Sequence, residues 1–384
     1  MKILQLGKFY PIRGGVEKVM RDLTEGLSER GVRCDMLCAK LPSVPVDTKD
    51  LGKEKVSKEV LAIQLNPYGR IICVKALAKW AGTMISPAMI SYLKAHCREY
   101  DIIHIHHPDP MAALALFLSG YKGRVIVHWH SDIVSQKLLL LFYKPLQNWM
   151  LRRAEQIVGT TPVYVKNSPH LKHFQPKCTA VPIGILPVPM KEADIARIRM
   201  SFMAKYHILS VGRLVPYKGY QYLIAAMQYL PESFELQIVG EGPLRSRLEK
   251  FIRENHLEHR VSLPGYLPEG DEFNALFGAC DVFVLPSIIK TEAFGIVQIE
   301  AMSCGKPVVA TTIPGSGVSW VNKDGVSGMN VPPRNAQMLA TAIQRVLGNR
   351  EKYSNGARHL YEERYTLDNM INNVLKIYEL KNEE

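Results

Sequence analysis

Two carboxylates in the second half of the chain have the spacing of groups that bind the two ends of one elongated ligand. Glu292 and Glu300 stand eight positions apart, and Ala293, Phe294 and Gly295 directly follow the first of them. The segment predicts a loop that leads into a helix, and eight residues of helix span ~12 Å. We expect each glutamate to accept hydrogen bonds from hydroxyl groups, with the three residues after Glu292 presenting backbone N–H groups at the helix start. The spacing exceeds the roughly 5–10 Å that paired-carboxylate hydrolysis of a glycosidic bond requires.

A second group of residues offers positive charge at the end of a predicted strand. Arg213 and Lys218 lie five positions apart on a turn that leads into a helix beginning near Gly219. A guanidinium matches a phosphate with two parallel N–H groups, and an ammonium acts as a compact point charge. Gly240 follows the next predicted strand and keeps the backbone open beside the same site. These residues indicate a site for a diphosphate leaving group, although an exposed basic loop would have the same composition.

The first half contributes a glycine pair and a group of histidines. Gly14 and Gly15 open a helix after the first predicted strand, where backbone N–H groups could receive a phosphate; an ordinary helix start is an equal alternative. His104, His106 and His107 have a spacing that metal sites use. They close a predicted strand and have no carboxylate motif beside them, so we expect no metal there.

The elements that must position these groups alternate along the whole chain. Short apolar runs are followed by amphipathic stretches, which is typical of parallel sheets covered by helices. With 384 residues, the chain is long enough for two such domains rather than one. Residues 41–58 predict a loop, and the aperiodic run 183–189 predicts a hinge. Predicted strands cover residues 3–6, 33–38, 61–65, 102–105, 124–128, 156–159 and 179–182, then 207–211, 235–239, 261–263, 281–285 and 307–311; predicted helices in the second half cover 219–230, 244–255, 272–279, 295–303, 336–347 and the chain from 352 onward.

The positive charge of the chain is confined to its first half. The net charge is +12, and residues 1–190 hold 26 basic and 14 acidic side chains, whereas residues 191–384 hold 22 of each. An excess of basic residues in this half of the chain favours an anionic partner, such as a membrane surface or a phosphorylated acceptor. The interleaved aromatic and basic residues of nucleic-acid-binding proteins are missing from the sequence, so we expect no nucleic acid as a partner.

One stretch of the basic half is compatible with a membrane surface. Residues 70–97 mix apolar side chains with Arg70, Lys75 and Lys79 and include Trp80. An amphipathic basic stretch of this kind can lie in the plane of a bilayer interface. Packing of the same stretch on a sheet is an equal alternative. No apolar run reaches the ~20 residues of a membrane span, and the first residues do not resemble a secretory signal. We therefore expect a cytoplasmic protein, with peripheral attachment to the inner face of a membrane.

Four motifs, in this order along the chain, resemble those of glycosyltransferase family 4. The resemblance covers nearly the whole sequence. It rests on Gly14-Gly15-Val16-Glu17, on Val211-Gly212-Arg213 with Lys218-Gly219, on Gly240-Glu241-Gly242-Pro243, and on Glu292-x7-Glu300 followed by Ala301-Met302-Ser303-Cys304-Gly305-Lys306-Pro307.

The resemblance implies the GT-B fold, an α/β architecture in which two Rossmann-like domains with parallel sheets face each other across a cleft. It implies an acceptor-side domain over residues 1–187 and a nucleotide-sugar-binding domain over residues 188–365. It also implies that a C-terminal helix, within residues 366–384, crosses back onto the first domain.

The resemblance further implies the roles of individual residues. Arg213 and Lys218 would bind the diphosphate, Glu292 the donor sugar and Glu300 the ribose. His130, which follows the predicted strand 124–128, matches the family histidine that faces the donor sugar; a buried core histidine is the alternative. Two further residues, Tyr266 and Leu267, match positions that flank the base.

The predicted reaction moves a hexose from a nucleoside-diphosphate sugar to a glycan or lipid-linked acceptor, with retention at the anomeric carbon, in cell-surface polysaccharide biosynthesis. Mannose, glucose and galactose remain open as the sugar. The Asp-x-Asp signature of metal-dependent glycosyltransferases does not occur in the sequence, and Arg213 and Lys218 could neutralise the leaving group, so we expect no metal or other cofactor. A sugar-nucleotide epimerase with the same fold is the alternative enzyme, and a nucleic-acid-binding protein is the alternative of another class.

Overall fold

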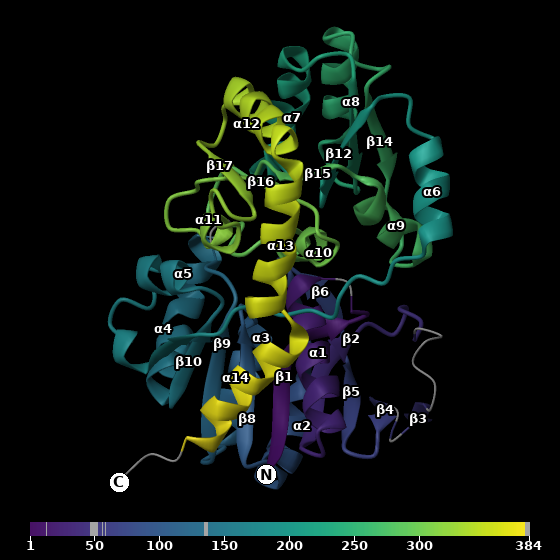
Figure 1. The fold of residues 1–384 in the computed structure, drawn as a ribbon. Coiled ribbons are helices and arrows are strands. Elements are labelled where there is room, and N and C mark those ends of the chain that lie inside the picture. The colour runs from purple at the N-terminus through teal and green to yellow at the C-terminus, as the bar shows by residue number, and fades with distance from the viewer. Residues whose placement is uncertain (13, 47–52, 56, 58, 134–136, 381–384) are drawn as a thin grey trace. The chain divides into compact units, whose positions relative to one another are not determined.

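The computed structural model describes residues 1–12, 14–46, 53–55, 57, 59–133 and 137–380. The chain divides into two compact units (Figure 1). Unit 1 comprises Met1–Ile183 together with Leu367–Glu384, and unit 2 comprises Gly184–Thr366. The sequence had placed the corresponding boundaries at residues 187 and 366, within a few residues of this division.

Unit 1 is built on a nine-stranded sheet with the order β11-β10-β9-β8-β1-β2-β5-β4-β3. Neighbouring strands run parallel from β11 to β5, and only the edge strands β4 and β3 pair antiparallel. The apolar residues of the central strands are fully buried, as expected for a sheet covered on both faces. The strands are β1 (Lys2–Tyr10), β2 (Arg33–Lys40), β3 (Lys53–Lys55), β4 (Val60–Asn66), β5 (Gly69–Lys75), β8 (Ile102–His107), β9 (Arg124–Trp129), β10 (Gln156–Gly159) and β11 (Cys178–Ala180).

The last helix of the chain, α14 (Leu367–Glu379), belongs to unit 1 and lies against its sheet (Figure 1). Its C-terminal carbonyls are held by β9, because Arg124 donates hydrogen bonds to the backbone oxygens of Tyr378 (2.6 Å) and Leu380 (2.8 Å). The expectation of a C-terminal helix that returns to the first domain is therefore met. The other helices of unit 1 are α1 (Gly15–Glu29), α2 (Pro87–His96), α3 (Pro110–Ser119), α4 (Lys137–Arg153) and α5 (Pro162–Asn167).

The stretch predicted to lie in a bilayer interface, residues 70–97, contains a strand, a short hairpin and a helix. Residues 69–75 are the strand β5, whose Ile71, Ile72 and Val74 are buried between β2 and β4. A short hairpin of β6 (Ala78–Trp80) and β7 (Thr83–Ile85) follows, and then α2. The β-branched run favours a strand, so residues 70–75 pack in the sheet, as the alternative interpretation expected. Leu77 and Trp80, which follow the strand, expose 64% and 62% of their surface.

The predicted loop at residues 41–58 contains one short strand, β3. Residues 47–52, 56 and 58 of this loop lie outside the described residues. Across the described chain, the structure offers no helix whose length and apolar character would suffice to cross a membrane.

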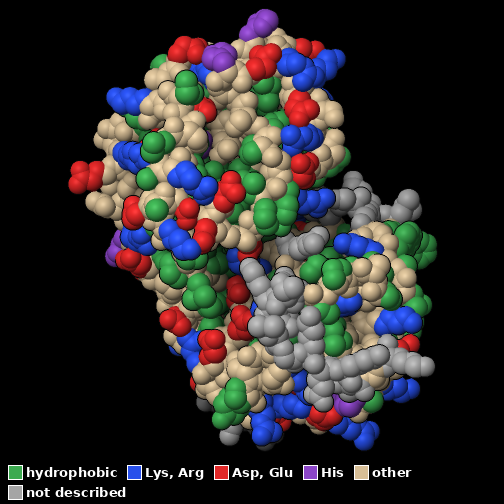
Figure 2. All heavy atoms as spheres, turned by 90° about the vertical axis from the view of Figure 1, so that its right-hand side faces the viewer, with side chains coloured by type: hydrophobic (Ala, Val, Ile, Leu, Met, Phe, Trp, Pro, Cys, Tyr) green, Lys and Arg blue, Asp and Glu red, His purple; other side chains and the backbone are tan. Residues whose placement is uncertain are grey.

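Unit 2 is a fully parallel six-stranded sheet with the order β14-β13-β12-β15-β16-β17. The predicted strands and helices of the second half are confirmed, and the structure adds α6, α11 and β17. Acidic and basic side chains are interspersed over the face of unit 2 in the upper part of Figure 2. The strands are β12 (Tyr206–Val211), β13 (Phe234–Val239), β14 (Val261–Gly265), β15 (Val282–Leu285), β16 (Val308–Thr311) and β17 (Gly328–Val331); the helices are α6 (Glu192–Met200), α7 (Tyr220–Ala226), α8 (Arg245–Glu254), α9 (Asp271–Ala279), α10 (Ile296–Ser303), α11 (Val318–Val321), α12 (Ala336–Gly348) and α13 (Arg350–Arg364).

Candidate active site

The turn after β12 brings Lys218 back beside the start of the same turn. The short 3-10 helix η3 (Pro216–Lys218) precedes Gly219, which has a φ of +68°. A Cβ at Gly219 would lie 2.3 Å from the carbonyl oxygen of Pro286, so only glycine fits there. A Cβ at Gly212 would lie 3.0 Å from Lys218 Nζ. The glycines therefore let the ammonium sit against the backbone at the carboxyl end of β12, where parallel sheets bind ligands.

Lys218 forms a buried ion pair with Glu292. Its Nζ lies 2.7 Å from Glu292 Oε2, and Ser287 Oγ donates a hydrogen bond of 2.9 Å to the same oxygen. Only 7% of Lys218 and 9% of Glu292 is exposed. The contacts that the structure shows for this carboxylate fall on Oε2, so Oε1 is left to accept from a ligand hydroxyl.

The electrostatics of this pair keep Lys218 charged. Burial lowers the pKa of the Lys218 ammonium, but the attraction of Glu292, helped by Tyr220 and Tyr217, outweighs burial and raises that pKa above its ordinary value. Burial also raises the pKa of the Tyr220 hydroxyl, which therefore stays neutral. The site thus holds one fixed cation and one fixed anion at neutral pH, both available to a polar ligand.

Gly240 packs against the backbone of Gly212. The sequence predicted that these two turns lie beside the same site. Gly240 has a φ of +146°, and a Cβ there would lie 2.1 Å from the carbonyl oxygen of Gly212. The backbone of one turn packs on that of the other, so a larger residue at position 240 would displace the Gly212 turn and, with it, Lys218.

The segment that joins the two glutamates is only partly helical. Helix α10 starts at Ile296, after Gly295 in the left-handed conformation with a φ of +77°. Residues 292–295 are thus not helical, and Glu300 is the fifth residue of α10. The ~12 Å expected of eight helical residues therefore applies only to the part of the segment that lies within α10. Glu300 is half-buried.

The residues between the glutamates are positioned by a neighbouring loop. Ala293 accepts a hydrogen bond of 2.9 Å from the backbone N–H of Gly317, and Phe294 is buried edge-on against Tyr365. Because α10 follows directly, its first N–H groups have no partner within the helix. This is the helix N-terminus that the sequence predicted beside Glu292.

The structure does not bring every predicted residue into contact with the ion pair. Arg213 is exposed, and among the described residues no hydrogen bond or ion pair joins it to Lys218 or Glu292. Tyr266, 64% exposed, and the half-buried Leu267 follow β14 at the edge of the sheet. Their roles toward a ligand remain predictions.

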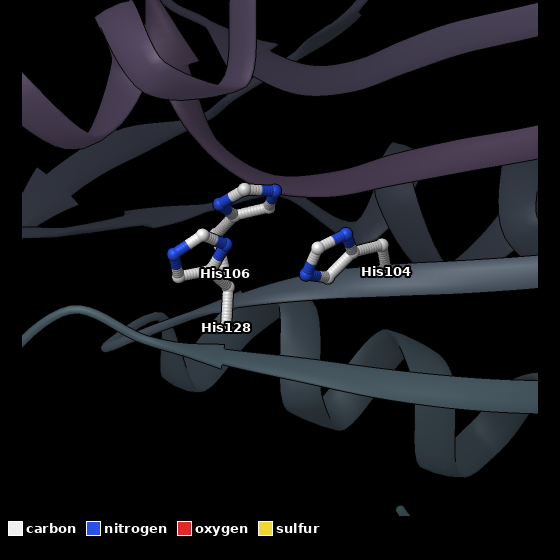
Figure 3. Close-up of side chains that lie close together, drawn as sticks. All are labelled: His104, His106 and His128. Carbon is white, nitrogen blue, oxygen red and sulfur yellow. The ribbon is translucent and has the colours of Figure 1, made fainter. Parts of the chain in front are cut away.

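In unit 1, His130 belongs to a cluster of buried histidines, together with His104, His106 and His128 (the histidine cluster). His106 and His128 are partners in the register of β8 and β9, and His104 precedes His106 by two residues, so these side chains share one face of the sheet. Figure 3 shows the rings of His104, His106 and His128 gathered on one side of the two strands. Burial lowers the pKa of the His128 imidazole to about 3 and lowers the pKa of the others well below the ordinary value. All four rings are therefore neutral at pH 7.

Three members of the cluster have ligand nitrogens within 4.8 Å of one another. Their rings, however, are nearly parallel, with interplanar angles of 13° for His104 and His128, 20° for His106 and His128, and 27° for His104 and His106. Imidazole lone pairs lie in the ring plane, so those of stacked rings do not converge on one point as metal ligation requires. His107, the third histidine of the predicted spacing, stacks on Trp129 with centroids 3.6 Å apart.

The glycine pair at the start of α1 already has an anionic neighbour. Gly14 is the N-cap of α1, and a Cβ there would lie 2.1 Å from Glu17 Oε2. Glu17 is buried, which raises the pKa of its carboxyl. A phosphate approaching Gly14 and Gly15 would meet this carboxylate, so their predicted role in donor binding requires Glu17 to move or to be protonated.

Sequence reasoning missed three residues that shape these sites: Ser287, Gln5 and Tyr378. The only signal for Ser287 is its place just after β15. Gln5 is a polar residue inside an apolar strand run, so its buried side chain requires a hydrogen-bond partner. No sequence pattern linked it to Tyr378, 373 positions away.

Comparison with known proteins assigns each of the two units to a glycosyltransferase family model. Residues 13–185 match the model of Glycosyltransferase Family 4, and residues 194–361 match that of Glycosyl transferases group 1. O-antigen chain mannosyltransferase C of Escherichia coli is 31% identical over 385 residues, which cover 98% of each chain. The chain belongs to glycosyltransferase family 4. A D-rhamnosyltransferase of Pseudomonas aeruginosa is 28% identical over 90% of this glycosyltransferase and 86% of the relative.

Solved structures show the same fold. A sucrose-phosphate synthase from Thermosynechococcus elongatus has a TM-score of 0.77 at 23% identity, and covers 98% of both chains. The HepE protein of Anabaena in complex with UDP-glucose has a TM-score of 0.75 at 20% identity, over 98% of this glycosyltransferase and 99% of that chain. The GT-B class and a hexosyltransferase activity are thereby confirmed, and the comparisons do not support the epimerase alternative.

Proposed function

We propose that this glycosyltransferase moves a hexose, with retention of anomeric configuration, from a nucleoside-diphosphate sugar to a glycan or lipid-linked acceptor in cell-surface polysaccharide biosynthesis. The observation that carries the proposal is the buried pair of Lys218 and Glu292 beside the glycine turns of unit 2. A relative that covers the whole chain is an O-antigen mannosyltransferase, which makes mannose the first sugar to test.

The ion pair of Lys218 and Glu292 offers one group to the diphosphate of the donor and one to its sugar. The Lys218 ammonium, held against Gly212, would neutralise the diphosphate as it leaves, without a metal ion. Glu292 Oε1 would accept from a hydroxyl of the sugar. Arg213 would approach the diphosphate from the solvent side, Glu300 would bind the ribose, and His130 would contact the donor sugar.

The contacts of Glu292 favour binding over nucleophilic attack. Its Oε2 is engaged by Lys218 and Ser287, and a carboxylate neutralised in this way is a poor nucleophile. We therefore favour the same-face route, in which the departing phosphate takes the proton of the acceptor hydroxyl while the acceptor oxygen bonds to the anomeric carbon.

A donor panel tests the proposal directly. GDP-mannose, UDP-glucose and UDP-galactose are incubated with the enzyme and an acceptor extract, and release of the nucleoside diphosphate is measured. We expect one donor to be consumed and NMR of the product to show the anomeric configuration of that donor. An inverted product would refute retention, and consumption of none of a wide panel of nucleotide sugars would refute the transfer itself.

A membrane surface remains part of the proposal, at a different place from the one predicted. Phe117 and Leu118 of α3 expose 48% and 45% of their surface, and Leu141 and Phe142 of α4 expose 65% and 80%. The two helices pack together, with Phe117 edge-on against Trp149 at 4.9 Å. An exposed apolar face of this kind marks an interaction surface.

The charges of these helices complement an anionic bilayer. Neither α3 nor α4 contains an Asp or Glu, whereas α4 contains Lys144, Arg152 and Arg153. Basic side chains beside apolar ones bind anionic lipid surfaces. We propose that this face holds the enzyme near a lipid-linked acceptor.

A further inference from the structure

The loop that precedes α11 holds the carbonyl groups of Glu292 and Ala293. Ser316 Oγ donates a hydrogen bond to the carbonyl oxygen of Glu292, and the Gly317 N–H donates one of 2.9 Å to that of Ala293. Carbonyl oxygens can only accept, so the direction of both bonds is fixed. Ser316 is 1% exposed, which keeps water from competing for its bond. Both carbonyl groups therefore point toward this loop.

Gln298 of α10 holds the next carbonyl group in the same way. Its Nε2 lies 2.9 Å from the carbonyl oxygen of Phe294 and 3.5 Å from that of Val318. Because two carbonyl oxygens on one side of the amide admit only its NH₂ group there, the orientation of the buried amide is fixed. A Cβ at Gly295 would lie 2.8 Å from this Nε2, so the glycine makes room for the amide. The carbonyl of Phe294 thus faces the same segment, residues 316–318.

The peptide geometry then decides where three N–H groups point. The peptide bonds that follow Glu292, Ala293 and Phe294 are trans, and a trans unit carries its N–H on the side opposite to its carbonyl. The N–H groups of residues 293–295 are therefore directed away from residues 316–318. Within the described part of the chain, no hydrogen bond has any of these three N–H groups as its donor. The three residues are buried, and buried N–H groups are nearly always paired, which indicates a polar group from outside the chain.

The neighbouring carboxylate selects the kind of group that these N–H groups can bind. Glu292 Oε2 is engaged by Lys218 and Ser287, whereas Oε1 is open to a ligand. A phosphate beside Oε1 would be repelled. A hydroxyl group can instead donate to Oε1 and accept from an N–H at the same time. A sugar hydroxyl therefore fits this combination, and the diphosphate is left to Lys218.

We propose that Gln298 and Ser316 are positioning residues: by holding the carbonyls of Phe294 and Glu292, they aim the N–H groups of residues 293–295 at hydroxyl groups of the donor sugar. The inference rests on the function proposed above, in which unit 2 binds the sugar of a nucleotide donor. The orientation of the three peptide units does not depend on that function. A sugar without the hydroxyl would leave both the carboxylate and the N–H groups unpaired, so the enzyme should discriminate strongly against it.

The test compares the binding of a nucleotide sugar with that of the same nucleoside diphosphate without sugar, by calorimetry. GDP-mannose and GDP are the first pair; if the donor panel selects another sugar, that donor and its own diphosphate replace them. Gln298→Met keeps the length of the side chain and removes both amide hydrogens, and Ser316→Ala removes the hydroxyl. We expect each variant to weaken binding of the nucleotide sugar about 3- to 10-fold and binding of the diphosphate less than about 2-fold.

Deoxy analogues of the donor sugar show whether the effect passes through a hydroxyl group. Removal of the hydroxyl that residues 293–295 bind should weaken binding to the wild type. Gln298→Met should then have little further effect, because the two changes remove the same contact. Ser327→Ala is the matched control, since it removes a fully buried hydroxyl that bonds Asn322 Oδ1 at 2.8 Å. It should leave both affinities unchanged.

Amide hydrogen exchange of the wild type, followed by NMR, tests the proposal even if a variant does not fold. Exchange at Ala293, Phe294 and Gly295 should slow when GDP-mannose binds, because the sugar hydroxyls then accept from these N–H groups. GDP alone should not slow it.

Equal slowing by GDP would assign the three N–H groups to the diphosphate and overturn the proposal, as would equal losses of affinity for GDP and GDP-mannose in both variants. Unchanged exchange with a nucleotide sugar that the enzyme does transfer would also overturn it, while the transfer would stand. Slowed exchange with a nucleotide sugar, together with transfer to no acceptor, would instead refute the proposed function alone.

Discussion

Replacement of Glu292 by Gln should leave the Lys218 ammonium buried without a counter-charge. The two side chains are only 8% and 11% exposed, and breaking a buried ion pair from one side costs about 3–5 kcal/mol of unfolding free energy. The amide keeps the shape of the carboxylate and can still accept from Ser287. We therefore expect a loss near the lower end, about 3 kcal/mol, in the unfolding transition of unit 2.

The pH dependence identifies Lys218 as the cause. In the wild type the pKa of Lys218 is raised, so its stabilising contribution is complete below the unfolded pKa of ~10.4 and is lost only as pH rises through the folded value. In Glu292→Gln, burial lowers that pKa without opposition from the carboxylate. The unfolded state then binds more protons, and stability rises with pH. The deficit of the variant should shrink between pH 7.5 and about 9.5.

Calorimetric unfolding at the two pH values measures both effects. The control is Glu249→Gln, which removes the partner of Arg245 in a pair that is 37% and 34% exposed and should cost about 0–1 kcal/mol at either pH. The double variant Lys218→Met with Glu292→Leu should regain stability and yet have no transferase activity. A deficit below ~1 kcal/mol at pH 7.5, or one that does not change with pH, would refute this account of the pair.

Four further outcomes are expected. Glu300→Ala should chiefly raise the donor KM, by about 10-fold or more, whereas Arg213→Ala should lower kcat; equal effects on both constants in both variants would contradict the assigned roles. Transfer should persist in excess chelator and gain nothing from magnesium or manganese, and abolition by the chelator with rescue by either ion would show that a metal supplies the charge. Acidification from pH 7 to 5.5 should selectively destabilise unit 1, by about 1.4 kcal/mol for each member of the histidine cluster. The pKa values of these histidines are depressed in the folded state, which therefore cannot take up the protons that the unfolded state binds. An unfolding transition of unit 1 that does not change with pH would disprove this. Vesicles with anionic lipid should bind the enzyme less as salt rises. Phe142→Glu should weaken binding, whereas Met203→Glu, at a still more exposed site of unit 2, should not; equal binding to neutral vesicles would exclude the membrane surface.

Much of unit 2 could be predicted because its short elements each carry a local signal. Gly219, Gly240 and Gly295 mark the ends of strands or the starts of helices, and the structure places all three at positive φ. Only glycine adopts a positive φ without strain, so a glycine at the end of an apolar run is a signal that a single sequence carries. The motif carrying Glu292 therefore led to the right loop and the right helix, whose predicted start lies one residue before that of α10.

The remaining features depend on pairings between distant residues. The stretch from Arg70 onward has the composition of both a strand and an amphipathic surface element, and only its pairing with β2 and β4 decides. The contact of Lys218 with Glu292 depends on two separate loops. In unit 1, the histidine cluster was read as a strand end, because the partner strand that adds His128, and the helix that adds Tyr378, are specified only by tertiary packing.

The return of α14 to unit 1 has a consequence for the order in which the protein is made. The ribosome completes residues 1–183 long before it releases residues 367–384, since all of unit 2 lies between them. At roughly 5–20 residues per second, this interval lasts on the order of ten to forty seconds. During that time the sheet of the nascent unit 1 lacks the helix that seals Gln5 and His104. The residues of unit 2 are therefore all present before those of unit 1, although most of unit 1 is synthesised first.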